Sequence, residues 1–188
     1  MGREVHDIAH AAGRSVAGFL DDAAPVLGSI DSADPLAAEY VVAVGDPQIR
    51  VALVRRLAAR GCRFATVIHP SAVIGSRTEL ASGCVVAAFA YVGPDSRVGP
   101  HTVLNVNSLV GHDCVVGDFC VLSPFAAINS ECQVDREVFI GAHAVVGPRV
   151  TVGGRSKLSA GAVVCSDVPA GSLMVGNPAR GRVVFPAE

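Results

Sequence analysis

The sequence predicts a parallel β-helix built from six-residue steps, preceded by a small α/β region. Three observations support this prediction. An aliphatic residue recurs at every sixth position of the second half, a small residue follows each of them four positions later, and helical and strand-like patterns alternate before them. We expect residues 1–66 to form the α/β unit and residues 67–188 to form the β-helix with a C-terminal tail.

The composition restricts the partners and the compartment. The 188 residues carry a formal net charge of -2, so nucleic acid is not an expected partner. No run of about 18 apolar residues indicates a membrane span, and the charged N-terminus MGREVHDIAHAAG lacks the apolar core of a secretory signal. The six cysteines include no CxxC pair, so we expect reduced thiols and a cytoplasmic protein.

The first 66 residues alternate between helical and strand-like patterns. We expect helices at residues 3–12, which Gly13 closes, and 49–61, with Gly61 as the C-cap. We expect strands at residues 15–22, 39–46 and 64–69, which together would form a small parallel sheet.

Four residues of this region are candidates for a nucleotide site. Ligands of parallel α/β sheets bind beyond the carboxyl ends of the strands. The strand at 15–22 would end at Asp21 and Asp22, and the strand at 39–46 at Gly45 and Asp46. The alternative is that Asp21 and Asp22 only form a solvated strand end.

The repeat begins at Ile68, and every sixth residue from there to Val164 is Ile, Leu or Val. Three six-residue steps would close one triangular coil of about 18 residues, with the aliphatic side chains stacked inside. The small position runs from Ala72 to Val168 and contains Cys84, Cys114, Cys120 and Cys132, which we therefore interpret as small core residues rather than ligands or nucleophiles. Glycines directly after the aliphatic position are expected to adopt unusual backbone angles.

The histidines do not form a metal site by their spacing. His69, His101, His112 and His143 occupy four different places in the 18-residue coil, so none stacks on another. His6 and His10 are four residues apart on the first expected helix, but surface histidines are the simpler interpretation. We therefore expect no metal.

Five segments together resemble one family: FLDD, VAVGDPQIR, FATVIHPSAVIG, VGHDCVVGDFC and DVPAGSLMVGNPAR. The chain is similar to the sugar O- and N-acyltransferases of the sialic acid O-acetyltransferase and bacillosamine-pathway acetyltransferase type. The resemblance implies a homotrimer of left-handed β-helices, with active sites between neighbouring subunits. It also implies acetyl-CoA in a groove between two helices, and a nucleotide sugar or another sugar held by the α/β unit.

The resemblance assigns roles to six residues. His112 would be the general base and Asp113 its acidic neighbour, and Asn105 would contact the substrate. The backbone N–H of Ser130 would meet the thioester carbonyl, and the N–H groups of Gly141 and Ser159 would meet the pantetheine arm of acetyl-CoA. Histidine suits the base role because its ordinary pKa, about 6.5, lies near neutral pH. The pairing of His112 with Asp113 requires a bend, because adjacent residues in a straight strand point oppositely.

Two departures from the family concern the acceptor. The first apolar strand and the Gly-rich turn that usually precede GREV are absent, so we expect either a start further upstream or weak acceptor binding. Val121 stands where many members have a histidine, and Phe125 stands where glycine is usual. Both replacements put the acceptor and the acyl group in question.

The function that the sequence predicts is transfer of acetyl from acetyl-CoA to the amine of a nucleotide-linked amino sugar. Two alternatives remain open: an O-acetyltransferase of sialic acid or another sugar hydroxyl, and a non-catalytic trimeric scaffold.

Overall fold

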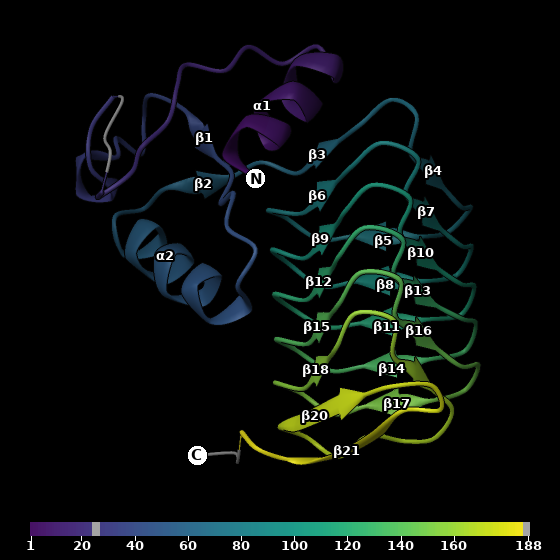
Figure 1. Ribbon diagram of the computed structural model, residues 1–188. Helices are drawn as coiled ribbons and strands as arrows, with labels where there is room; N and C mark the ends of the chain where they lie inside the picture. Colours follow the sequence, from purple (N-terminus) through teal and green to yellow (C-terminus); the bar gives the residue numbers. More distant parts are fainter. Residues whose placement is uncertain (24–26, 186–188) are drawn as a thin grey trace.

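The computed structural model describes residues 1–23 and 27–185. An N-terminal region of helices and two short strands lies beside a long parallel β-helix, which ends in a hairpin (Figure 1). The predicted architecture, a short α/β region followed by a parallel β-helix, is confirmed.

The N-terminal region contains α1 (Gly2–Ala11), the 3-10 helix η1 (Ile30–Ser32), β1 (Glu39–Tyr40), α2 (Pro47–Ala59) and β2 (Arg63–Phe64). Both predicted helices are present. Helix α2 begins slightly earlier than expected because the Asp46 carboxylate accepts hydrogen bonds from the N–H groups of Gln48 and Ile49, with Pro47 in the first turn.

The strand predictions for this region were largely wrong. Residues 15–22 form no strand, and only Leu20 makes an isolated bridge, to Gly28. The expected strand at 39–46 is limited to β1, which pairs in parallel with β2. An apolar run becomes a strand only where a neighbouring strand takes its hydrogen bonds, and within the described residues this sheet has two strands.

The β-helix has three faces, which we number in chain order. The first face holds β3 (Val67–Ile68), β6 (Val85–Val86), β9 (Val103–Leu104), β12 (Val121–Leu122), β15 (Phe139–Ile140), β18 (Lys157–Leu158), β20 (Ser172–Val175) and the antiparallel β21 (Arg180–Val183). The second face holds β4 (Val73–Ile74), β7 (Tyr91–Val92), β10 (Leu109–Val110), β13 (Ala127–Ile128), β16 (Val145–Val146) and β19 (Val163–Val164). The third face holds β5 (Glu79–Leu80), β8 (Arg97–Val98), β11 (Val115–Val116), β14 (Gln133–Val134) and β17 (Thr151–Val152).

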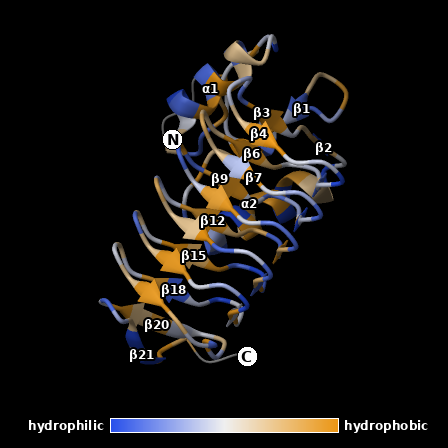
Figure 2. Ribbon diagram, turned by 90° about the vertical axis from the view of Figure 1, so that its right-hand side faces the viewer, coloured by the Kyte–Doolittle hydropathy of each residue, from blue (hydrophilic) through white to orange (hydrophobic). Residues whose placement is uncertain are grey.

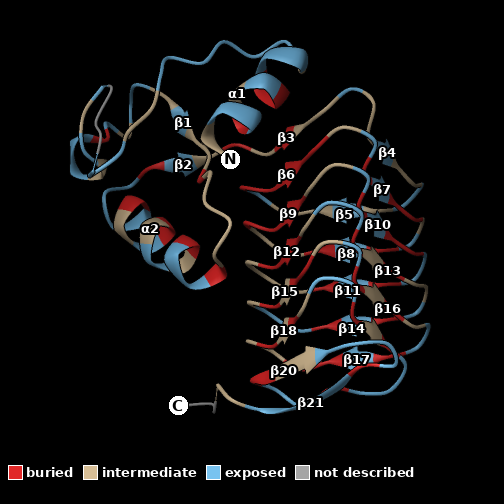
Figure 3. Cartoon of the chain, viewed as in Figure 1, coloured by how far each residue is buried: buried red, intermediate tan, exposed pale blue. Residues whose placement is uncertain are grey.

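The aliphatic ladder fills the interior, as the repeat predicted. One coil takes 18 residues, so Val110 pairs with Val92 and with Ile128 on the second face. Every aliphatic repeat position from Val86 to Val164 belongs to one buried core, with Ile68, Ile74 and Leu80 packed against it at its N-terminal end. Buried residues follow the strands, while the corners are partly or fully exposed and mostly polar (Figures 2 and 3).

The small position has a second role that the sequence did not indicate. Except for Ser108, whose hydroxyl has no partner among the described residues, its hydroxyl and thiol groups donate hydrogen bonds to carbonyls of the next coil. Examples are Thr102 Oγ1 to Gly117 O (2.9 Å) and Cys120 Sγ to Asp135 O (3.0 Å). Burial raises the pKa of the Cys120 thiol to about 12, so the thiol keeps its proton and can donate. The four core cysteines are buried as predicted, and they act as weak donors as well as small apolar groups.

The glycines after the aliphatic position have a different cause from the one expected. Their backbone angles are ordinary, and left-handed angles occur two residues later, at non-glycine residues such as Asp113 (φ 56°). Glycine is needed for close approach instead, since a Cβ on Gly117 would lie 2.6 Å from the amide nitrogen of Arg136 in the next coil. These two coils are therefore stacked too tightly at Gly117 to admit a side chain there.

A matched pair of variants measures this constraint. Gly117→Ala is expected to lower the free energy of unfolding by about 1–3 kcal/mol because backbone must move to admit the methyl group. Gly147→Ala, at the same position of its hexad but at the vertex between the second and third faces, is expected to cost less, because its Cβ would lie 3.1 Å from the nearest atom. Urea unfolding followed by circular dichroism measures both. Equal losses of unfolding free energy in the two variants would show that the close approach of the coils does not determine the cost of a side chain.

Candidate active site

His112 and Asp113 lie at the vertex between the second and third faces, where β10 ends and β11 follows. Asp113 adopts a left-handed conformation (φ 56°), which supplies the bend that the sequence required. His112 Nδ1 lies 2.7 Å from Asp113 Oδ2, and the two side chains are 52% and 58% exposed. A neutral ring that donates its Nδ1 proton to this carboxylate would leave Nε2 unprotonated and able to accept a proton from a ligand.

Ser130 lies one coil below His112 at the same vertex. Its N–H has no hydrogen-bond acceptor among the described residues, and Glu131 beside it donates to His112 O (2.9 Å). The same place is taken by Pro94 in the coil above His112 and by Pro148 in the coil below Ser130, and proline has no N–H. A free backbone donor therefore lies at the same vertex as His112, one coil away.

Asn105, Gly141 and Ser159 lie on the other vertex of the second face, between the first and second faces. Their donors are engaged with the next coil: Asn105 Nδ2 donates to Leu122 O (2.8 Å), and the amides of Gly141 and Ser159 donate to Leu158 O and Met174 O (2.8 and 2.9 Å). A ligand at this vertex would instead meet the N–H groups of Ala142 and Ala160, for which no described residue is an acceptor. Within one chain, the width of the second face separates these residues from His112.

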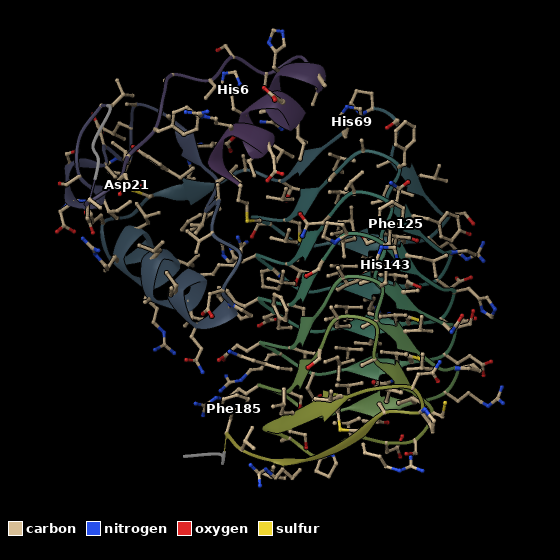
Figure 4. The ribbon with its side chains drawn as sticks, in the orientation of Figure 1. His6, Asp21, His69, Phe125, His143 and Phe185 are labelled. Carbon is tan, nitrogen blue, oxygen red and sulfur yellow. The ribbon has the colours of Figure 1, made fainter. Side chains whose placement is uncertain are left out.

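The four N-terminal candidates do not form one cluster. Asp22 binds Arg56 in the second half of α2 (2.6 Å), and Arg56 holds the pKa of Asp22 below its ordinary value. Asp46 instead caps the start of α2, ten residues before Arg56, which corresponds to about 15 Å along the helix. Gly45 precedes this cap, and Asp21 lies on the side of the N-terminal region away from the β-helix (Figure 4). The missing strand at 15–22 explains the separation, because no sheet edge gathers the strand ends.

Val121 and Phe125, which stand where the family usually has histidine and glycine, have different surroundings. Val121 is 2% exposed on the first face, in an apolar cluster with Val5 and Ile8 of α1. Phe125 stacks on His143, with ring centroids 4.8 Å apart and planes 2° from parallel, at the vertex that carries Asn105 (Figure 4). The pairing of Phe125 with His143 was not predicted, although their separation of 18 residues, one coil, could have indicated it.

A groove lies on the third face, and the sequence did not indicate it. It has a volume of about 670 Å³ and begins at Val115, directly after the His112 corner in the same coil. It continues down the next coils past Arg136 and Arg155 to Phe185 of the C-terminal tail. The buried Nε atom of Arg155 has no hydrogen-bond partner among the described residues. Arg136 and Arg155 lie at the vertex between the third and first faces, across the third face from the imidazole, and the carboxylates of Asp118 and Asp135 also line the groove.

Residues 1–23 and 27–185 contain no group of three or more histidine, cysteine or carboxylate side chains that could hold a metal ion. Within the same ranges, no helix is both long and apolar enough to cross a membrane.

The N-terminal part of the chain, residues 1–57, matches the family described as PglD N-terminal domain. Comparison with curated protein sequences gives no match.

Solved structures match nearly the whole chain. PerB from Caulobacter crescentus, solved with CoA and GDP-perosamine, is 31% identical with a TM-score of 0.91; the alignment covers 96% of this chain and 92% of PerB. The acetyltransferase domain of PglB from Neisseria gonorrhoeae, also solved with acetyl coenzyme A, is 32% identical with a TM-score of 0.91 (95% and 93% covered). WeeI from Acinetobacter baumannii is 26% identical with a TM-score of 0.88 (96% and 94% covered). The chain therefore belongs to the family of β-helical sugar acyltransferases of the sialic acid O-acetyltransferase and bacillosamine-pathway type, and it is an acetyl-CoA-dependent acetyltransferase.

Proposed function

We propose that the protein transfers the acetyl group of acetyl-CoA to the amine of a nucleotide-linked amino sugar, with His112 as the general base. The observation that carries this proposal is the His112–Asp113 pair at a vertex that also holds the unused N–H of Ser130, one coil away. PerB, which was solved with CoA and GDP-perosamine, supports the substrate class.

The proposed chemistry is direct transfer in one ternary complex. The acceptor amine attacks the thioester carbonyl while His112 Nε2 removes its proton, and the negative charge on the carbonyl oxygen is stabilised by the N–H of Ser130. Asp113 holds the ring through Nδ1 and stabilises the imidazolium. When the C–S bond breaks, the proton passes from His112 to the thiolate, so the products are the N-acetyl sugar and CoA-SH.

The third-face groove is the proposed place for the nucleotide part of acetyl-CoA. It starts in the coil of His112 and extends over the next three coils, which at about 4.8 Å per coil gives about 15 Å. Arg136 and Arg155 would bind phosphate oxygens, and Arg155 Nε would gain the partner that it lacks.

We further propose that the protein is a homotrimer with the second face toward the threefold axis. The outward side chains of this face are all apolar: Val73, Tyr91, Leu109, Ala127, Val145 and Val163. Val73, Tyr91 and Leu109 are exposed. The first face is packed against α1, while the third carries charged and polar residues such as Glu79, Arg97 and Gln133. Only the second face is thus both apolar and uncovered among the described residues.

A cyclic trimer would also complete the site. If each chain turns its second face inward, the two vertices of that face meet the two neighbouring chains. The vertex with His112 and Ser130 would then adjoin the partner's vertex with Asn105, Gly141 and Ser159. The residues that one chain keeps apart would form one composite site, with Phe125 and His143 in its wall.

The test of the proposed function is turnover. Purified protein with acetyl-CoA and a set of UDP-, GDP- and dTDP-linked amino sugars should release free thiol and give an acetyl product that resists mild alkali, as an amide does. An alkali-labile product, formed with sialic acid or a neutral sugar, would assign O-acetylation instead. An intact trimer with no thiol release on any acceptor would favour the non-catalytic scaffold.

A further inference from the structure

Arg50 of α2 is a fully buried charged side chain with 0% exposure. No described carboxylate pairs with it. Its guanidinium donates instead to three backbone carbonyls: Nη1 to Val42 O and to Val44 O (2.9 Å), and Nε and Nη2 to His101 O (3.1 and 2.6 Å). Burial lowers the pKa of Arg50 to about 10, so the side chain stays charged at neutral pH.

These carbonyls belong to two separate parts of the fold. Val42 and Val44 lie in the segment that joins β1 to the start of α2, whereas His101 lies at the β-helix vertex between the third and first faces. A buried guanidinium is costly unless its donors are satisfied, so the three carbonyls must stay in place around it. Arg50 therefore ties the segment that leads to Gly45 and Asp46 to the rigid β-helix.

The contact point on the β-helix is itself fixed by packing. The His101 ring packs edge-on against Phe64 of β2, with centroids 4.6 Å apart, and stacks on Phe119 one coil below, at 5.1 Å. A Cβ on Gly83, one coil above, would overlap the same ring. His101 as a whole residue is 6% exposed, and the Nδ1 atom of its ring has no hydrogen-bond partner among the described residues.

We propose that Arg50 is a positioning residue that latches the N-terminal region onto the β-helix in the orientation required for acceptor binding. The latch acts through the backbone of residues 42–46 and touches neither substrate nor acetyl-CoA. The inference rests on the proposed function only for its kinetic consequence, because the latch itself can be measured without any substrate.

Charge at His101 should regulate the latch. Burial and the nearby Arg50 guanidinium lower the pKa of His101, and Asp118 opposes this shift only in part. A histidine with a lowered folded-state pKa is neutral when docked, so docking is fully stable above the ordinary pKa of about 6.5 and weakens as the pH falls below it. Cys84 also lies close to Arg50, and its thiol is neutral because burial raises its pKa.

The test compares Arg50→Lys, Arg50→Met and the exposed control Arg55→Met. We expect Arg50→Met to raise KM for the acceptor at least tenfold and to leave KM for acetyl-CoA within twofold. Arg50→Lys should give an intermediate value, because a lysine ammonium can bond to fewer carbonyls. Arg55→Met should change neither constant. If Arg50→Met instead destabilised the whole protein, both KM values and the thermal midpoint of the β-helix would change.

Hydrogen exchange provides a reading that does not depend on turnover. The amides of Gln48 and Ile49, which donate to Asp46 Oδ1, and of Ala65, which donates to Tyr40 O, should exchange faster in Arg50→Met than in the wild type, while the β-helix coils below β9 stay protected. In the wild type this exchange should increase between pH 6.5 and 5 beyond its intrinsic pH dependence, and His101→Phe should remove that increase. Unchanged exchange in Arg50→Met would overturn the latch even if the enzyme acts on another acceptor. Changed exchange with no turnover on any amino sugar would leave the latch standing and reject the proposed function.

Discussion

Replacing His112 with asparagine is expected to lower kcat by about 10²–10⁴-fold, the usual contribution of general base catalysis. Asparagine occupies similar space at the exposed vertex but cannot take the proton from the acceptor amine. KM for acetyl-CoA should change little, because His112 acts on the acceptor. Thiol release at saturating substrates measures the effect.

Two further variants make the result specific. Asp113→Asn should lower kcat less than His112→Asn, because Asp113 acts through the imidazole and the ring itself remains. His10→Asn, on the exposed side of α1, should leave kcat unchanged. The assignment of His112 as the base would be wrong if His112→Asn kept more than a tenth of the wild-type rate while its circular dichroism matched that of the wild type.

The substitution Leu109→Arg is expected to convert the proposed trimer to monomers and to abolish activity. Leu109 lies at the centre of the apolar second face, between Tyr91 and Ala127 on neighbouring strands. Three arginines around one axis would place unpaired like charges in an apolar interface, which costs several kcal/mol. Light scattering gives the oligomeric state. The β-helix itself should survive, because the side chain points away from the core.

Leu36→Arg is the matched control, since Leu36 is 90% exposed in the segment before β1. It should remain trimeric and active. A wild-type protein that is already monomeric, or a Leu109→Arg trimer with full activity, would contradict the composite site. Loss of activity without loss of the trimer would indicate a local effect of Leu109 on the neighbouring His112 corner.

The sequence was most informative where the structure repeats. The aliphatic ladder and the small position predicted the coils, the core and the place of each core cysteine, because a six-residue period can be satisfied only by stacked units that share one interior. It also predicted the bend at Asp113. The glycines do lie at corners of the β-helix, as expected, but the expected reason, unusual backbone angles, was wrong. The actual reason is the close approach of neighbouring coils, and the sequence does not show how closely the coils stack.

In the N-terminal region, local pattern was a poor guide. Residues 15–22 have an apolar, strand-like composition, yet they find no strand partner, and the acidic residues that follow are therefore scattered. Asp46 serves as a helix cap, and Asp22 as the partner of Arg56. Strand formation depends on long-range pairing, which a single segment cannot reveal.

The sequence by itself determined the β-helix, its core and the His112–Asp113 pair, because these depend on residues within one or two hexads. Only the tertiary structure decided that Asn105, Gly141 and Ser159 lie across the second face from His112, and that a buried arginine joins the N-terminal region to a corner of the β-helix. The reason is physical. A short period fixes which side chains point inward, whereas the distance between vertices and the docking of a separate unit depend on how whole faces pack.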